Sequence, residues 1–227
     1  MKFSSSILQV FLAIMFLSCG GKNGEKEAVV NDSIREQSTT AETNVKTILF
    51  FGNSLTAGYG LDPVEAFPAL IQKKIDSLSL PYMVINAGVS GETTAGGSAR
   101  IDWILRQPIH VFVLELGAND GLRGIPVTET RKNLQLIIDK VKEKNPETLL
   151  VLAGMQVPPN MGPQYSKEFR EIFPLLAKEN NMILIPFLLE GVGGERELNQ
   201  EDGIHPTAEG HAILADNIWQ AMKDSLQ

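Results

Sequence analysis

The stretch "LFFGNSLTAG", residues 49–58, reads as a buried strand that ends at Gly52 and then presents Ser54. Its apolar residues run without alternation, which is typical of parallel strands covered on both faces. Gly, Asn and Ser are also ordinary turn residues, so this stretch alone does not decide whether Ser54 is a nucleophile. A catalytic serine needs a base to take its proton and donors to hold an oxyanion.

The same pattern of apolar runs and amphipathic helices continues along the chain. Further strands are predicted in "YMVINAG", "HVFVLELGAND", "TLLVLAGM" and "MILIPFLL", and helices over residues 65–78, 94–107, 128–145, about 166–180, and from Pro206 onward. Strands that alternate with helices predict an α/β fold, a three-layer α/β/α sandwich around a parallel sheet of about five strands. We expect one domain, residues 46–227.

Polar, glycine-containing loops follow the first three predicted strands. They are "GNS", "AGVSGET" and "GAND". In parallel sheets, function collects at the carboxyl ends of the strands, so these loops are expected to meet at one edge.

The chain has three histidines as candidate bases for Ser54. His110 begins an apolar strand and His211 lies inside the last helix, so structural roles are expected for both. His205 lies in the loop "EDGIHPTAEG", three residues after Asp202. A carboxylate at this spacing can hold one ring nitrogen and leave the other for a hydroxyl. An isolated Asp-x-x-His more often caps a helix, but the converging loops favour a catalytic triad.

Three groups are candidate oxyanion donors. They are the backbone N–H of Ser54, the backbone N–H of Gly91 and the side-chain amide of Asn119. Taken alone, Gly91 fits a plain turn and Asn119 a helix cap. Asp120 is expected to be structural, capping or bracing its loop.

Composition and motifs exclude several classes of function. The net charge of −7 and the pI near 5.1 argue against binding to nucleic acid. No His-Glu-x-x-His, Cys/His cluster or Gly-x-Gly-x-x-Gly is present, so no metal and no other cofactor is expected. The residue two places after Ser54 is Thr56, so the Gly-x-Ser-x-Gly elbow of lipase-type α/β-hydrolases is absent.

The N-terminus has the features of an export signal. Lys2 precedes an apolar stretch from Ile7 to Leu17, and small residues follow at 18–20. "FLSCG" resembles a bacterial lipobox, with Phe16 in place of the usual leucine. The resemblance predicts a signal peptide over 1–18 and lipid attachment at Cys19. The segment that follows is polar and has no apolar period, so a flexible tether is expected over 19–45. The protein would then be a lipoprotein of the bacterial cell envelope, periplasmic or attached to the outer membrane. A soluble secreted protein, cleaved nearby, is the alternative.

Four ordered blocks, "FFGNSLTAGYG", "NAGVSGETTAGG", "ELGANDGLRG" and "DGIHP", resemble the SGNH (GDSL) hydrolase family. Similar stretches point to its bacterial periplasmic thioesterase, lysophospholipase and arylesterase branch. The family residues match Ser54, Gly91, Asn119 and His205, with Asp202 completing the triad. One departure is Asn53, where the family usually has Asp, and this change bears on how the loop is braced or on how activity depends on pH.

The resemblance implies a flavodoxin-like sheet and a serine esterase or thioesterase acting on acyl, lysophospholipid or aryl esters. Its substrate would be a small molecule, and its only contact with a membrane would be the lipid at Cys19. A carbohydrate O-deacetylase of the same superfamily is an alternative. A ligand-binding lipoprotein without activity is a second alternative, although it would have no need of this residue set.

Overall fold

Five parallel strands form one sheet in the computed structural model, which describes residues 45–226. Their order is β2-β1-β3-β4-β5, so the strand that precedes Ser54 has a neighbour on each side. The strands are β1 (Lys46–Gly52), β2 (Tyr82–Gly88), β3 (Val111–Glu115), β4 (Leu149–Ala153) and β5 (Ile183–Ile185).

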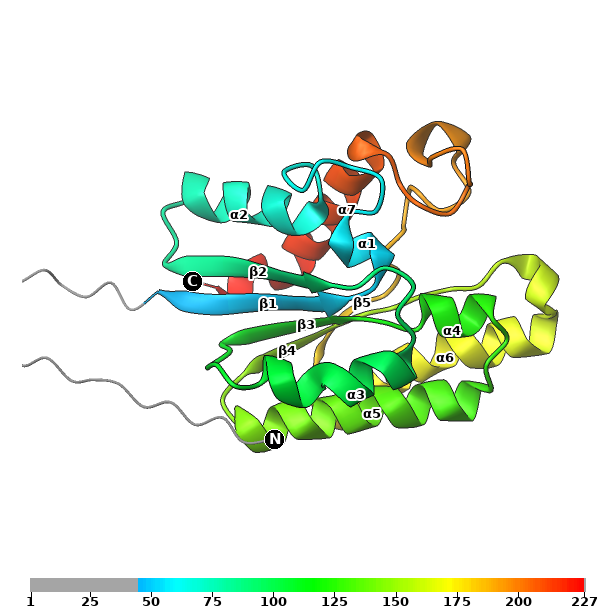
Figure 1. Ribbon diagram of the computed structural model, residues 1–227, viewed down its shortest axis with the longest axis horizontal. Coiled ribbons are helices and arrows are strands. Elements are labelled where there is room, and N and C mark those ends of the chain that lie inside the picture. Colours follow the sequence, from blue (N-terminus) through cyan, green and yellow to red (C-terminus); the bar gives the residue numbers. More distant parts are fainter. Residues whose placement is uncertain (1–44, 227) are drawn as a thin grey trace, which may run out of the picture. The chain divides into compact units, whose positions relative to one another are not determined.

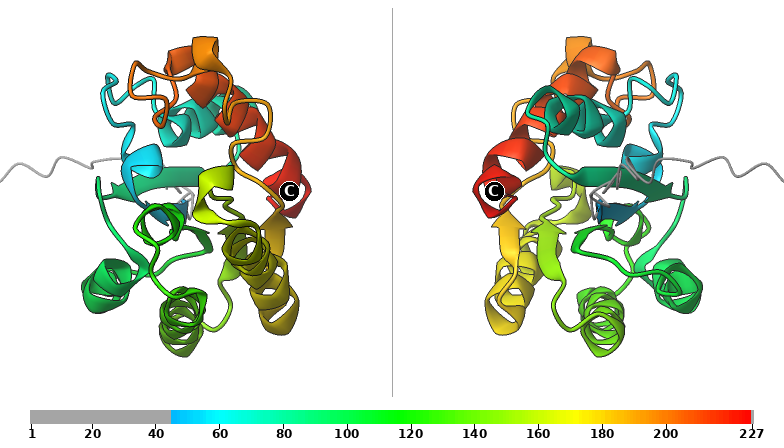
Figure 2. Two further views of the ribbon diagram at one scale, coloured as in Figure 1. Left: turned by 90° about the vertical axis from the view of Figure 1, so that its right-hand side faces the viewer. Right: turned by 90° about the vertical axis from the view of Figure 1, so that its left-hand side faces the viewer.

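Helices cover both faces of this sheet (Figure 1), which confirms the three-layer α/β/α prediction. One face carries α2 (Phe67–Ser77) and α7 (Ala208–Met222), and the other carries α3 (Thr94–Ile104), α5 (Val127–Lys144) and α6 (Pro163–Asn180). Figure 2, in which the view is along the strands, shows the helices divided between the two faces of the sheet. Two short helices, α1 (Ser54–Ala57) and α4 (Ala118–Leu122), follow β1 and β3 at the carboxyl end of the sheet. Single 3₁₀ turns span Pro159–Met161, Arg196–Leu198 and Lys223–Ser225.

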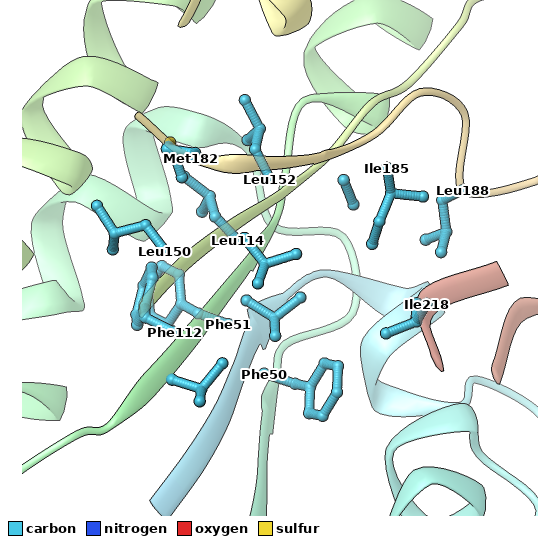
Figure 3. Packing of buried hydrophobic residues seen from close by; sticks show 14 of the residues in the cluster. Phe50, Phe51, Phe112, Leu114, Leu150, Leu152, Met182, Ile185, Leu188 and Ile218 are labelled. Carbon is cyan, nitrogen blue, oxygen red and sulfur yellow. The ribbon is translucent and has the colours of Figure 1, made fainter. Parts of the chain in front are cut away.

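The apolar runs are continuous because the central strands are buried on both faces. Phe50 and Phe51 are consecutive in β1 and point to opposite faces, where both are fully buried (Figure 3). The ring of Phe50 meets Phe67 of α2 edge-on at 5.6 Å, and that of Phe51 lies 5.6 Å from Phe112 of β3. Burying a side chain of this size contributes about 1.5–3 kcal/mol. The core therefore holds the end of β1 in place, just before Ser54.

Several predicted boundaries were wrong, two of them for clear local reasons. The last helix begins at Ala208, not at Pro206, because Thr207 is its N-cap and accepts a hydrogen bond from the Gly210 N–H at 3.3 Å. Strand β5 spans only Ile183–Ile185, since Pro186 has no N–H to continue the ladder.

Within residues 45–226, the helices are all too short or too polar to cross a membrane. The signal peptide, the lipidated Cys19 and the tether predicted up to residue 44 lie outside the described residues, and they stay predictions.

Candidate active site

Ser54 is the first residue of α1, directly after the turn that ends β1. Asn53 is the N-cap of this helix, and its side-chain oxygen accepts a hydrogen bond from the Leu55 N–H at 2.9 Å. Gly52 lets Glu115 approach the backbone closely here, because a Cβ at this position would lie 2.5 Å from a carboxylate oxygen of Glu115. The Ser54 hydroxyl is thus presented at the carboxyl edge of the central strand, as the sequence predicts.

The structure brings His205 and Asp202 to this hydroxyl from the loop before α7. Nε2 of His205 lies 2.9 Å from Oγ of Ser54, although 151 residues separate them in the chain. Nδ1 of His205 lies 2.6 Å from Oδ2 of Asp202. A carboxylate can only accept, so the proton belongs on Nδ1, and Nε2 is left to accept from the hydroxyl. This is the tautomer that a general base for Ser54 requires.

The Asp202 carboxylate is held in its ionised form. The hydrogen bond from the His205 side chain, followed by those from the backbone N–H groups of His205 and Ile204, lowers its pKa to about 2. The two backbone bonds, at 3.0 and 2.9 Å, both go to Oδ1 and leave Oδ2 for the imidazole. Asp202 is therefore negative at any pH well above 2 and can stabilise a positive charge on the ring.

Gln200 fastens the His205 loop to the loop after α1. Its backbone N–H donates to the His205 carbonyl at 2.7 Å, and its side-chain amide donates to the carbonyls of Tyr59 at 2.7 Å and Pro206 at 3.0 Å. The Tyr59 ring lies against the imidazole of His205, with the ring centres 4.5 Å apart. Hydrogen bonds from Gln200 therefore connect the backbone of the His205 loop to the backbone at Tyr59, shortly after Ser54 in the chain.

The loops with the two other oxyanion candidates are joined to each other. The Asn119 amide, in α4, donates to the Glu92 carbonyl at 2.9 Å, and Arg123 donates to the Gly91 carbonyl at 3.0 Å. Gly91 has a positive φ of 79°, a conformation that favours glycine. One of the two N–H bonds of the Asn119 amide is thereby used, and the other is left for a ligand.

Arg100 ties this loop to the end of the sheet. Its guanidinium donates to the carbonyls of Ala87 at 2.8 Å and Gly52 at 3.4 Å, and it forms a bidentate pair with Glu92 at 2.6 Å. The ends of β1 and β2 and the Gly91 loop are therefore held together, which is the convergence that the polar loops predict.

Asp120 braces the site, as predicted. It is fully buried in α4, and its carboxylate accepts from both the backbone N–H and the hydroxyl of Thr94, at the start of α3.

The two remaining histidines have the structural roles expected of them. His110 accepts a hydrogen bond from the Thr47 N–H at 3.0 Å, and His211 accepts one from the Phe67 N–H at 3.1 Å. Burial, with a smaller contribution from His205, lowers the pKa of His211 to about 4, so this ring is neutral near pH 7.

Glu115 belongs to the site and is missed by the sequence reasoning. Glu115 is the last residue of β3 and is 1% exposed. Its carboxylate accepts hydrogen bonds from the backbone N–H and the side-chain amide of Asn53, directly before Ser54. The signal for it is a charged residue at the end of an otherwise apolar strand. Across residues 45–226, no three His, Cys, Asp or Glu side chains gather as metal ligands would.

Residues 50–213 of the chain match the GDSL-like lipase/acylhydrolase family, and this span includes all five residues predicted for the triad and the oxyanion hole. The chain is 38% identical over 188 residues to the esterase TesA of Pseudomonas aeruginosa, which covers 82% of this chain and 92% of TesA. It is 40% identical over 176 residues to thioesterase 1/protease 1/lysophospholipase L1 of Escherichia coli, covering 77% of this chain and 81% of the relative.

Solved structures show the same fold. The crystal structure of TesA superposes with a TM-score of 0.75 at 38% identity and covers 79% of this chain and 99% of its own. The psychrotrophic esterase EstA from Pseudoalteromonas sp., in a crystal structure inhibited by monoethylphosphonate, also has a TM-score of 0.75, at 35% identity. That match covers 80% of this chain and 98% of EstA.

Proposed function

Since this chain belongs to the GDSL-like lipase/acylhydrolase family, we propose that it hydrolyses carboxylic ester and thioester bonds with Ser54 as the nucleophile. The proposal rests on one observation above all, the chain of hydrogen bonds from Ser54 Oγ through the His205 ring to Asp202. A hydroxyl is a weak nucleophile until a base takes its proton, and this arrangement provides that base.

The proposed reaction is acyl transfer in two steps. His205 takes the proton of Ser54 as Oγ attacks the carbonyl carbon, and Asp202 stabilises the imidazolium that forms. The N–H groups of Ser54 and Gly91 and the amide of Asn119 bind the developing oxyanion. His205 then gives its proton to the leaving alcohol or thiol, and a water molecule, activated by the same ring, releases the acid.

Apolar side chains near the nucleophile favour an acyl or aryl ester as substrate. Tyr59, which packs against the His205 ring, is 51% exposed, and Ile204, which directly precedes His205 in the chain, is 48% exposed. Val89 is also exposed, and its N–H donates to the Gly52 carbonyl at the end of β1. A hydrocarbon chain or an aromatic ring that covered these side chains would remove apolar surface from water on binding.

A series of p-nitrophenyl esters from acetyl to palmitoyl, with matching acyl thioesters, tests this function. We expect kcat/KM to rise from acetyl toward medium or long chains, because each buried methylene contributes about 0.8 kcal/mol. A strict preference for acetyl would favour a carbohydrate O-deacetylase instead. A chain that hydrolyses none of these esters and does not react with an organophosphate would be a ligand-binding protein.

We propose in addition that the protein is exported and carries a lipid on Cys19. The support is the sequence of residues 1–20, with its basic start, apolar centre and small residues around Cys19. Cells expressing the full chain and fed radiolabelled palmitate are expected to label it and to keep it in the membrane fraction. The Cys19→Ala variant is expected to lose the label and the membrane attachment, and unchanged attachment would contradict the proposal.

A further inference from the structure

One buried carboxylate, that of Glu115, accepts hydrogen bonds from the residues on both sides of Ser54. Asn53, before the serine, donates to Glu115 through its backbone N–H at 3.1 Å and its side-chain amide at 2.7 Å. Thr56, two residues after the serine, donates through its backbone N–H at 3.2 Å and its hydroxyl at 2.7 Å. All four partners of Glu115 are donors, and they lie on both sides of Ser54 in the chain.

The neighbouring residues are matched to this arrangement. The Asn53 amide uses its nitrogen to bind Glu115 and its oxygen to cap α1 through the Leu55 N–H. An amide can do both at once, because it carries a donor and an acceptor, whereas a carboxylate has no donor when ionised. Asn53 and Thr56 are both fully or almost fully buried, so water cannot replace these bonds.

We propose that Glu115 and Asn53 are positioning residues, which hold the Ser54 hydroxyl at His205 and the Ser54 N–H toward the oxyanion by fixing both ends of the first turn of α1. This inference rests on the proposed function, since it assigns a role relative to Ser54 as nucleophile. The arrangement acts only while the Glu115 carboxylate is ionised. A protonated Glu115 must donate from one oxygen. The Thr56 hydroxyl, 2.7 Å from Oε2, can accept that hydrogen bond, but it then no longer donates to the carboxyl group, and the set of four donated bonds is broken.

The protonation state of Glu115 changes within the working range of pH. Burial raises its pKa from 4.5 to about 7, and this effect outweighs the opposing hydrogen bonds from Thr56 and Asn53. The charged groups on surrounding elements are Arg100 of α3 with its partner Glu92, buried Asp120 of α4, and the Asp202–His205 pair beyond Ser54.

Activity and stability are therefore expected to respond to Glu115 with opposite signs. Positioning of Ser54 improves as the pH rises through about 7 and the carboxylate ionises. Because the pKa is higher in the folded chain than in the unfolded one, proton binding stabilises the fold below pH 4.5, and this stabilisation is lost as the pH rises through about 7. Ser54 is therefore best positioned above a pH of about 7, where Glu115 contributes least to the stability of the fold.

The test compares wild type with Glu115→Gln, using Glu179→Gln as the control for loss of one carboxylate, since Glu179 forms only an exposed ion pair with Arg131. Glu115→Gln is expected to lower kcat about 10- to 100-fold with little change in KM, the effect of a small displacement of a reacting group. In a plot of kcat/KM against pH, the acid limb of this variant is expected to be less steep than that of wild type. The melting temperature of the variant minus that of wild type is expected to increase as the pH rises. For Glu179→Gln, kcat, the acid limb and the pH dependence of the melting temperature are expected to match those of wild type.

A second variant keeps the inference testable if Glu115→Gln does not fold. Asn53→Asp sets a second carboxylate against Glu115, and the pair retains one shared proton at moderate pH. We expect this variant to be active there and to lose kcat on the alkaline side, where both groups ionise and wild type stays active. Alkaline activity equal to that of wild type would overturn the inference, as would a Glu115→Gln variant with the wild-type kcat and pH profile.

These results are separable from the proposed function. A fluorophosphonate that labels wild type at Ser54 supports the nucleophile whatever the variants do. If wild type is labelled and Glu115→Gln is labelled at the same rate with the same pH dependence, the nucleophile stands and the positioning role fails.

Discussion

The Ser54→Ala variant is expected to lose about 10⁶ in kcat while it keeps the wild-type fold, because loss of the nucleophile disables the whole triad. The change removes one oxygen, whose close partners are Nε2 of His205 at 2.9 Å and, more weakly, Oδ1 of Asn53 at 3.4 Å. None of the four hydrogen bonds to Glu115 involves the Ser54 side chain, so β1 and α1 stay in place. Steady-state turnover of a p-nitrophenyl ester, with circular dichroism and thermal unfolding, measures both parts.

A matched control for this variant is Ser77→Ala. Ser77 lies in α2, and its exposed hydroxyl donates only to the Lys74 carbonyl at 2.7 Å. Wild-type turnover is expected from this variant. Hydrolysis retained in purified Ser54→Ala, at a rate above that of contaminating esterases, would show that another group attacks the ester.

The Asp202→Asn variant is expected to lose about 10⁴ in kcat near neutral pH. An amide can present an N–H to Nδ1 of His205, which moves the ring proton to Nε2 and leaves no acceptor for the Ser54 hydroxyl. The wild-type carboxylate, with its pKa lowered to about 2, stays ionised throughout the range in which the enzyme is assayed. Asp202 therefore adds no titration to the acid limb of the wild-type profile above about pH 3, one unit beyond that pKa.

The control for Asp202→Asn is Asp216→Asn, which removes an exposed carboxylate of α7 paired with Lys74. Its kcat is expected to match that of wild type. If Asp202→Asn lost less than about tenfold, the charge and tautomer arguments would both be wrong, since a tenfold change corresponds to only about 1.4 kcal/mol.

The fold was predictable because burial on both faces leaves a plain record in the sequence. "TILFFG" and "HVFVLE" contain continuous apolar runs, so β1 and β3 were predictable as strands covered on both faces, whereas the strand order that places them inside the sheet comes from the structure. The ends of elements were less predictable, because they depend on single contacts. The last helix begins at Ala208 rather than at Pro206 because the N-cap Thr207 makes one side-chain hydrogen bond, which periodicity does not reveal.

The geometry of Asp202 and His205 was also predictable, because they are three residues apart and the loop between them is short. Glu115 was not predictable in the same way. Its partners lie 59 to 62 residues earlier in the chain, and a single charged residue leaves no period in the sequence. The departure at Asn53 was visible, but its meaning depends on Glu115, which only the packing of β1 against β3 brings to it.

Mapping the covalent adduct of a fluorophosphonate by peptide mass spectrometry tests directly whether Ser54 is the nucleophile served by His205. One adduct per chain is expected, on Ser54, formed much more slowly in His205→Ala and absent in Ser54→Ala. An adduct on any other residue, or hydrolysis that continues when Ser54 is fully modified, would contradict this assignment.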